Sequence, residues 1–390
     1  MRVVTERERR SRLAVRHGFV APTRGYRALA DRLVGIHSTD PVSAFVAAAA
    51  RRAVGSVEEV ESALYEDRSV LRMLGMRRTL FVQPVSRVAD VQRGYTDGFV
   101  DRERKRLAGW LEATGVAEDG ARHIERMATL VTSHLDEVGE AGTRELTTAH
   151  PELDVRFTPP VGSQTGTVSV GSRVVLLMTA AGRLARTRPL GTWVSSQYRY
   201  ASMHRWLGSP IESIPAPEAR ARLADAWLRS YGPGTLTDLK WWAGWNVGET
   251  KAALRAAGAV EVSLEHVTGF VAAGDETPVD DADDWVALLP ALDSTPMGWK
   301  ERDWYLGPHA GRLFDRNGNV GPTVWWNGRI VGGWAQRSDG SVPVLILEDV
   351  PQSVRRRVVG ESERLADFLG DTRFTPRFRT PLERELTAPG

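Results

Sequence analysis

The stretch YGPGTLTDLKWWAGWN, residues 231–246, decides how the chain is expected to fold. Its Gly-Pro-Gly run ends an amphipathic helix over 218–230, and Thr235 supplies a hydroxyl that caps a second helix through Trp242. Asn246 then begins a third helix over 247–257, and two short strands follow at 260–264 and 269–273. Three helices followed by a β-hairpin are typical of a winged helix, a helix-turn-helix with a β wing.

The preceding part of the chain repeats this plan less regularly. Helices are expected at 124–138, 144–146 and 172–182, and two short strands at 184–186 and 196–200 flank a wing-like loop. Further towards the N-terminus, helices are expected at 23–33, 42–54 and 57–66, with a strand over 77–83. The sequence therefore predicts an α+β chain with winged-helix domains at 1–120, 121–210 and 211–275.

The C-terminal third has a different character. An acidic linker, with six carboxylates between residues 275 and 284, separates it from the winged helices. Strand-like runs follow at 285–290, 320–326, 329–336 and 342–348, and Asn327-Gly328 is a strong hairpin turn signal. We expect a small β-barrel at 285–350, closed by a helix and tail at 351–390.

The composition of the 390 residues excludes several classes of site. With 42% hydrophobic and 26% charged residues, the chain is an ordinary soluble globular protein. It contains no cysteine and no HExxH motif, so we expect no metal and no cofactor. No apolar run could span a bilayer, and the N-terminus lacks the features of a signal peptide. We therefore expect a cytoplasmic protein without membrane contacts.

Arginines are concentrated in two places, near the N-terminus and over residues 173–205. The second of these stretches contains no Asp or Glu. This separation from the acidic linker is expected of a protein that lays one face on a polyanion, although a solvated charged face is the simpler alternative. Within the second group, Arg183, Arg186 and Arg188 border the predicted wing. We predict that these three residues contact DNA.

The cluster His37-Ser38-Thr39-Asp40-Pro41 has two interpretations. Asp40 followed by Pro41 is a preferred helix start, so the cluster could serve only as a cap. The same imidazole, hydroxyls and carboxylate could instead hold a water molecule against a substrate.

Two further segments contain candidate DNA contacts. Alternation over residues 77–82 places Arg77 and Arg78 on opposite faces of a strand, and the inward arginine needs a carboxylate or phosphate partner. A structural ion pair is the simpler alternative, and the sequence does not decide which of the two faces DNA. In the polar and aromatic loop over 289–302, Trp299 and Arg302 are candidates for stacking on bases or sugars.

Several dispersed motifs together resemble one family. They are LVGIHSTDP at 33–41, MRRTLFV at 76–82, YGPGTLTD at 231–238, residues 288–293 and NGRIVGGW at 327–334. These motifs are similar to the winged-helix DNA-binding proteins that include the AlkZ-like (YcaQ-type) alkylpurine-DNA glycosylases. The resemblance implies tandem winged helices arranged as a C around duplex DNA, with a β-barrel module. It also implies excision of N7- or N3-alkylated purines, including bulky and crosslinked adducts, in DNA repair or self-resistance to genotoxic natural products.

The catalytic motif of this family is Gln, an apolar residue, Gln, and the present chain departs from it. His37, Ser38 and Thr39 stand at the three positions, and Asp40 and Pro41 match the acidic residue and proline that follow. We expect a monomeric, monofunctional glycosylase at the nucleoid, in which His37 orients or deprotonates water, Asp40 supplies negative charge or fixes the imidazole, and Thr39 binds water. The alternatives are a non-catalytic winged-helix regulator or lesion binder, and an inactive paralogue.

Overall fold

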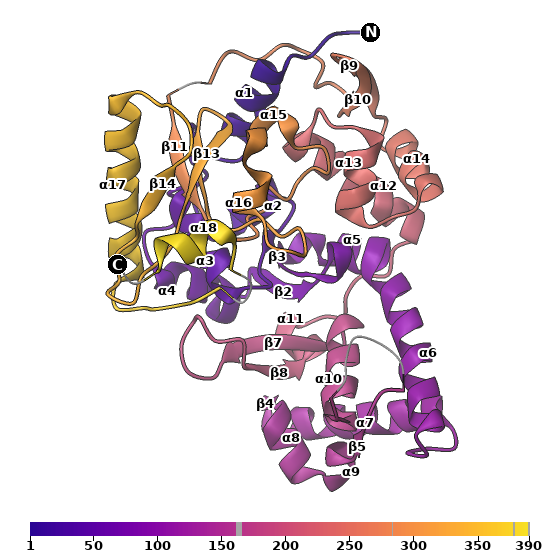
Figure 1. Ribbon diagram of the computed structural model, residues 1–390. Helices are drawn as coiled ribbons and strands as arrows, with labels where there is room; N and C mark the ends of the chain where they lie inside the picture. Colours follow the sequence, from indigo (N-terminus) through magenta and orange to yellow (C-terminus); the bar gives the residue numbers. More distant parts are fainter. Residues whose placement is uncertain (161–165, 283, 377–378, 389–390) are drawn as a thin grey trace.

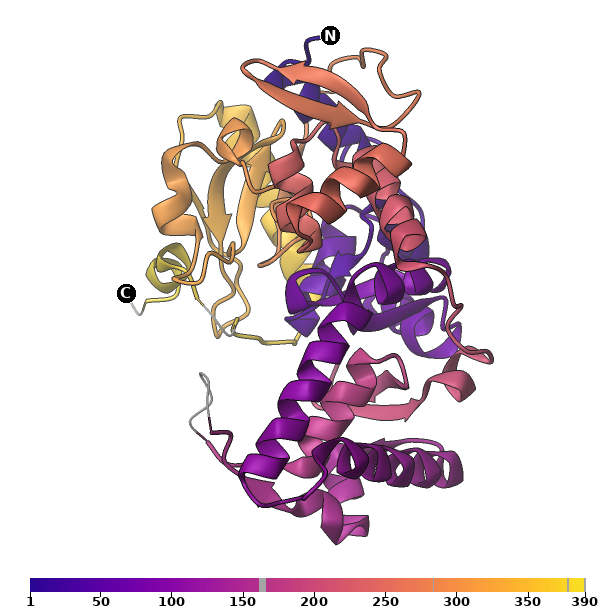
Figure 2. The same cartoon turned by 90° about the vertical axis from the view of Figure 1, so that its right-hand side faces the viewer.

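The computed structural model describes residues 1–160, 166–282, 284–376 and 379–388 (Figure 1). Two bodies are visible. The helices and strands from α7 to α11 form the smaller, lower body, and the remaining segments form the larger, upper one. Helix α6 (Asp97–Ala113) runs from the upper body into the lower one, as the turned view in Figure 2 shows.

The first segment holds the three-stranded antiparallel sheet β1-β3-β2, in which β3 is central. The strand predicted over 77–83 begins only at Leu80, because residues 76–78 form a tight turn. The elements of this segment are α1 (Glu6–Arg16), α2 (Tyr26–Arg32), β1 (Ile36–His37), α3 (Pro41–Ala50), α4 (Val57–Glu61), η1 (Ser62–Glu66), β2 (Val70–Leu74), η2 (Met76–Arg78), β3 (Leu80–Pro84), η3 (Val85–Arg87), α5 (Val88–Val91) and η4 (Gln92–Thr96).

The lower body packs helices against the sheet β4-β8-β7. Its own apolar core includes Val100 and Leu111 of α6, so α6 packs with the lower body although the sequence analysis ends the first domain at residue 120. Its elements are α7 (Gly120–Val138), β4 (Ala141–Gly142), α8 (Thr143–Ala149), α9 (Pro151–Asp154), β5 (Arg156–Phe157), β6 (Val168–Ser169), α10 (Val170–Ala180), β7 (Leu184–Pro189), β8 (Tyr198–Ser202) and α11 (Met203–Leu207).

Residues 216–271 contain the predicted elements in the predicted order. They are α12 (Ala216–Tyr231), α13 (Leu236–Ala243), α14 (Val247–Ala256), β9 (Val260–Leu264) and β10 (Val267–Val271). Thr235 and Asn246 each accept a hydrogen bond from the third backbone N–H of the helix they begin, as expected of N-caps. The predicted three helices and hairpin are therefore confirmed as secondary structure.

The predicted β-barrel is wrong. The strands pair as an open antiparallel sheet in the order β11-β12-β13-β14, and no closed barrel forms in the described part of the chain. Helix α17 covers a face of this sheet and buries Val354 and Val358 against Leu288 and Val331. This segment comprises β11 (Val286–Leu289), α15 (Asp303–Leu306), η5 (Gly307–His309), α16 (Ala310–Leu313), β12 (Thr323–Trp326), β13 (Arg329–Trp334), β14 (Val344–Ile346), α17 (Gln352–Leu369) and α18 (Pro381–Leu386).

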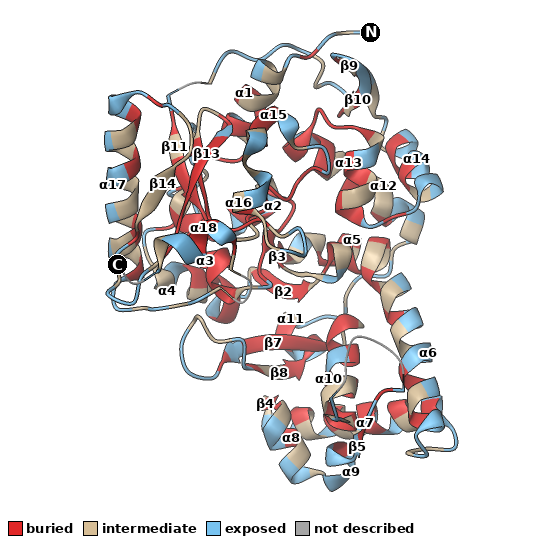
Figure 3. Cartoon of the chain, viewed as in Figure 1, coloured by how far each residue is buried: buried red, intermediate tan, exposed pale blue. Residues whose placement is uncertain are grey.

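The upper body is held together by an apolar core. Residues of the first segment, of the segment from α12 to β10 and of the C-terminal segment all contribute to it. Figure 3 shows buried residues along its strands and on the inner sides of its helices. Within the described residues, no helix combines the length and apolar character needed to cross a membrane.

Candidate active site

The loop with the predicted catalytic residues lies along sheet β1-β3-β2. His37 in β1 pairs with Phe81 in β3. The Ser38 backbone N–H donates to the carbonyl oxygen of Leu80 at 2.7 Å, and the Leu80 N–H donates to Thr39 Oγ1 at 3.1 Å. Three consecutive residues of the loop are therefore fixed to one strand.

A second support comes from a distant part of the chain. The His37 backbone N–H donates to Ser294 Oγ at 3.0 Å, and the same hydroxyl donates to the carbonyl oxygen of Gly35 at 3.0 Å. The neighbouring Asp293 forms a bidentate ion pair with Arg51, at 2.6 and 2.9 Å, and both side chains are fully buried. A rigid buried pair thus anchors the residue that holds the loop.

The His37 imidazole is buried, with 1% of the residue exposed. Its ring packs edge-on against the ring of Phe81, and the two ring centroids are 5.0 Å apart. Neither Nδ1 nor Nε2 has a hydrogen-bond partner in the described part of the chain. Burial lowers the pKa of His37 from 6.5 to about 3, and the nearby charge of Arg77 acts in the same direction. The ring is therefore neutral at physiological pH, with one nitrogen that donates and one that accepts.

Asp40 is the N-cap of α3, as the helix-cap interpretation predicts, and its carboxylate accepts from the Val42 N–H at 3.3 Å. Burial raises the pKa of Asp40, and this hydrogen bond opposes the rise. No cation pairs with Asp40 among the residues that the structure describes. Thr39, beside it, is exposed. The loop therefore presents an unpaired carboxylate next to a hydroxyl at the surface.

The sequence analysis missed the residue that holds the middle of the loop. Arg72 of β2 donates from Nε to Ser38 Oγ at 2.7 Å and from Nη1 to Tyr65 Oη at 3.2 Å. The available signal was a single arginine inside the otherwise apolar run VLRML at 70–74. A charged residue in such a strand needs a polar partner, but the sequence does not say where that partner lies.

Arg77 and Arg78 do not alternate along a strand as predicted. Both have left-handed backbones, with φ of 55° and 63°, in the turn before β3. The guanidinium of Arg77 lies 3.9 Å from the ring centroid of Trp241, and Arg302 lies 4.8 Å from the same ring. The expected carboxylate partner of Arg77 is absent among the described residues. Burial, and to a smaller extent the charge of Arg302, lower the pKa of Arg77 to about 10. The structure thus brings Arg77 and Arg302 together on Trp241, and the charge of Arg77 acts on His37.

Two predicted DNA-binding residues are buried instead. Trp299 is 2% exposed and donates from Nε1 to the carbonyl oxygen of Tyr231 at 3.1 Å, inside an aromatic cluster. It cannot stack on a base without unfolding this core, so that prediction is wrong. Arg186 is 7% exposed, between the upper and lower bodies. Because its side chain is largely buried, a contact of Arg186 with DNA stays a prediction.

The other two arginines of the predicted wing are engaged in ion pairs. Arg183 donates to Glu125 at 3.1 Å. Arg188 lies 2.7 Å from both Glu61 and Glu66, which belong to the upper body. To contact DNA, these arginines would have to exchange their glutamate partners for phosphate groups. Their contacts with DNA stay a prediction.

Three arginines of the basic N-terminal cluster are paired with the acidic linker. Arg7 pairs with Asp281 at 2.8 Å, and both Arg12 and Arg16 pair with Asp275. These arginines therefore act as internal counter-charges, which reduces the positive surface expected from the sequence.

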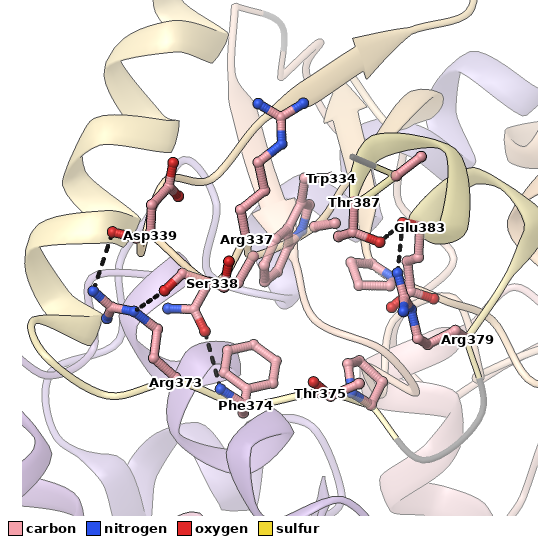
Figure 4. Close-up of a pocket in the computed structure, with 15 residues that line it drawn as sticks. Trp334, Arg337, Ser338, Asp339, Arg373, Phe374, Thr375, Arg379, Glu383 and Thr387 are labelled. Atoms are coloured by element: carbon pink, nitrogen blue, oxygen red, sulfur yellow. Dashed lines mark hydrogen bonds between the residues drawn. The ribbon is translucent and has the colours of Figure 1, made fainter. Parts of the chain in front are cut away.

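A pocket of about 760 Å³ lies between the end of β13 and the C-terminal segment. Figure 4 shows its polar lining, in which Arg373 donates to the backbone carbonyls of Ser338 and Asp339. His37, Thr39 and Asp40 do not line this pocket. In the described part of the chain, no group of three His, Asp or Glu side chains has the arrangement of a metal site.

Comparisons with known proteins identify a family and a similar fold. The family model "DNA glycosylase AlkZ-like" matches residues 30–368. The solved structure of the Streptomyces sahachiroi DNA glycosylase AlkZ is similar, with a TM-score of 0.72 at 20% identity, over 97% of this chain and 100% of that one. No curated protein sequence matches the chain. Because the family model spans most of its length, this chain belongs to the AlkZ-like DNA glycosylase family.

Proposed function

We propose that the protein is a monofunctional DNA glycosylase that hydrolyses the N-glycosidic bond of bulky or crosslinked N7- or N3-alkylated purines in duplex DNA. The observation that carries the proposal is the His37 imidazole, buried and with both nitrogens unpartnered, at the first position of the family's catalytic motif. Buried polar groups without partners are rare in folded proteins and call for an explanation, and a bound water held for catalysis is the one that this proposal gives.

The alkylated purine needs little activation as a leaving group. Alkylation at N7 or N3 makes the purine cationic, so it leaves readily as a neutral base when the bond to C1′ breaks. The enzyme then stabilises an oxocarbenium-like sugar and delivers a water oxygen to C1′. Because a conjugate acid with a pKa of about 3 belongs to a weak base, His37 is suited to orienting this water by hydrogen bonds rather than to deprotonating it.

Asp40 supplies the negative charge. Its carboxylate has one hydrogen bond, from the Val42 N–H, and no paired cation among the described residues. It is therefore free to stabilise the positive sugar and to accept the proton that the attacking water loses. The exposed Thr39 hydroxyl is the third water ligand in this proposal.

DNA contacts are assigned to Arg77 and Arg302, with Arg78 at the exposed end of the same turn. Paired guanidinium groups without a carboxylate favour the phosphate backbone. A lyase step needs an amine that forms a Schiff base. The chain has four lysines, and among the described residues none is joined to the 33–41 loop by a hydrogen bond or ion pair, so the proposal assigns no such amine to the reaction.

The test is excision from duplex DNA that carries N7-methylguanine or a bulky N7 adduct, read as alkali-labile abasic sites. Wild-type protein is expected to produce them. His37→Ala should bind the duplex without producing them, and Asp40→Asn should bind it and produce them about 100-fold more slowly. Asp119→Asn is the matched control, because Asp119 is also an aspartate whose side chain caps a helix, α7, in the lower body. Binding of intact DNA with sequence preference, and no excision of either substrate, would overturn the proposal in favour of a non-catalytic winged-helix binder.

A further inference from the structure

Three buried side chains with unused donors meet at the junction of the upper and lower bodies, where β2 packs against β7 (Figure 1). They are Arg72 of β2, Arg186 of β7 and Tyr198 of β8, which are 3%, 7% and 9% exposed. The guanidinium of Arg72 lies 5.0 Å from the ring centroid of Tyr198. The function proposed above uses none of these three side chains.

Each of these three side chains has a buried hydrogen-bond donor that is not used. Arg72 Nη2, Arg186 Nη1 and Tyr198 Oη are buried and have no partner among the described residues. All three atoms carry hydrogens that can be donated. The group that would complete the cluster is therefore an acceptor.

The charges give the same answer. The pKa of Arg186 is lowered, first by burial, and the positive charge of Arg72 contributes in the same direction while neighbouring tyrosines oppose it. For Arg72, burial lowers the pKa but the neighbouring tyrosines raise it more. Neither arginine has a carboxylate partner in the described part of the chain. Two buried cations without a counter-charge are unfavourable, and water alone would satisfy the donors without neutralising the charge.

We propose that Arg72, Arg186 and Tyr198 form an oxyanion-binding site, filled by a phosphate group, that fastens the lower body to the upper one. The phosphate is either free inorganic phosphate or a backbone phosphate of bound DNA, and only the second source rests on the function proposed above. Arg72 also donates to Ser38 Oγ, so an anion here fixes the middle of the 33–41 loop. Arg72 is thus a positioning residue.

The first arm of the test needs no DNA. The melting temperature of the full-length protein is measured against inorganic phosphate, with chloride at equal ionic strength as the reference. A saturable rise is expected for the wild type, none for Arg186→Gln, and a reduced rise for Arg186→Lys, which keeps the charge. Arg199→Gln on β8 is the control, because Arg199 is paired with Glu140 and Glu145 outside the cluster. No rise beyond that in chloride, or an equal rise in Arg186→Gln, would overturn the site.

The second arm identifies the source. If a DNA phosphate fills the site, Arg186→Gln lowers the slope of log K against log salt for duplex binding by about one, and Arg199→Gln does not. If free phosphate fills it, the slope is unchanged while the melting shift of the first arm persists. Failure to bind DNA would contradict the proposed function and leave the first arm to decide the anion site.

Discussion

Replacing His37 with Gln tests whether this imidazole is buried and neutral. Glutamine keeps a donor and an acceptor at the first motif position, as in the family pattern, but it does not titrate. In the folded protein the pKa of His37 is lowered from 6.5 to about 3. Between these pH values the unfolded chain binds a proton at His37 that the folded protein does not bind. Acid therefore lowers the free energy of unfolding of the wild type as the pH falls below about 6.5.

The size of the effect follows from the shift. One unit of pKa corresponds to about 1.4 kcal/mol, so the penalty grows at that rate per pH unit below 6.5 and reaches about 2 kcal/mol at pH 5. Above pH 6.5 it vanishes. His17 is also buried with a lowered pKa, but it is present in both proteins, so its contribution cancels in the difference.

The assay is urea unfolding of wild type and His37→Gln at pH 7 and pH 5, with the free energy extrapolated to water. The wild type is expected to lose about 2 kcal/mol more than the variant on going from pH 7 to pH 5. An equal loss in both proteins would refute the burial argument, because His37 would then titrate alike in the folded and unfolded states.

The remaining predictions concern the cap, the anchor and the arginine pair. Asp40→Asn is expected to melt near the wild-type temperature, because asparagine is also a good N-cap, but its excision rate should fall about 100-fold. The control Asp119→Asn should excise at the wild-type rate. Equal excision rates for the two variants would show that Asp40 is only a helix cap. Arg51→Met strands a buried carboxylate and should cost about 3–5 kcal/mol in urea unfolding, against less than about 1 kcal/mol for the exposed Arg52→Met. Similar losses for the two variants would show that the buried pair does not anchor the loop. Arg77→Gln should lower the salt slope of duplex binding by about one, and an unchanged slope, as expected for Arg52→Met, would remove Arg77 from the DNA interface.

The helices and hairpin of residues 216–271 could be predicted because their signals are local. Thr235 and Asn246 cap helices through bonds to N–H groups three residues away, and Gly232-Pro233 ends the helix before them. Such contacts are encoded within a few residues, so the sequence pattern and the structure agree.

The errors came from contacts between distant residues. Alternation predicts a strand at Arg77, but its guanidinium packs on Trp241 and the backbone turns. The four strands of the predicted barrel are present, yet closure depends on pairing β11 with β14, and α17 covers the sheet instead. The tryptophan at 299 suits a core or a stacking surface equally well in sequence, and only the fold places it inside.

The cap role of Asp40 could be predicted from the proline after it, but the contacts that support the loop could not. The catalytic roles of His37, Thr39 and Asp40 come from the resemblance to the family motif and stay a prediction. Arg72 and Ser294 hold the loop from 34 and 257 residues away, and no local pattern connects them to it. The isolated arginine in an apolar strand was the one usable signal.

The central claim is that this loop hydrolyses the bond between an alkylated purine and its sugar. The most direct measurement is single-turnover release of free N7-methylguanine from a methylated duplex, detected by mass spectrometry, for wild type, His37→Gln and His37→Ala. We expect release by the wild type and by His37→Gln, which preserves the hydrogen bonds to water, and none by His37→Ala. Release that is equal in all three proteins, or absent from the wild type while the duplex is bound, would contradict the account.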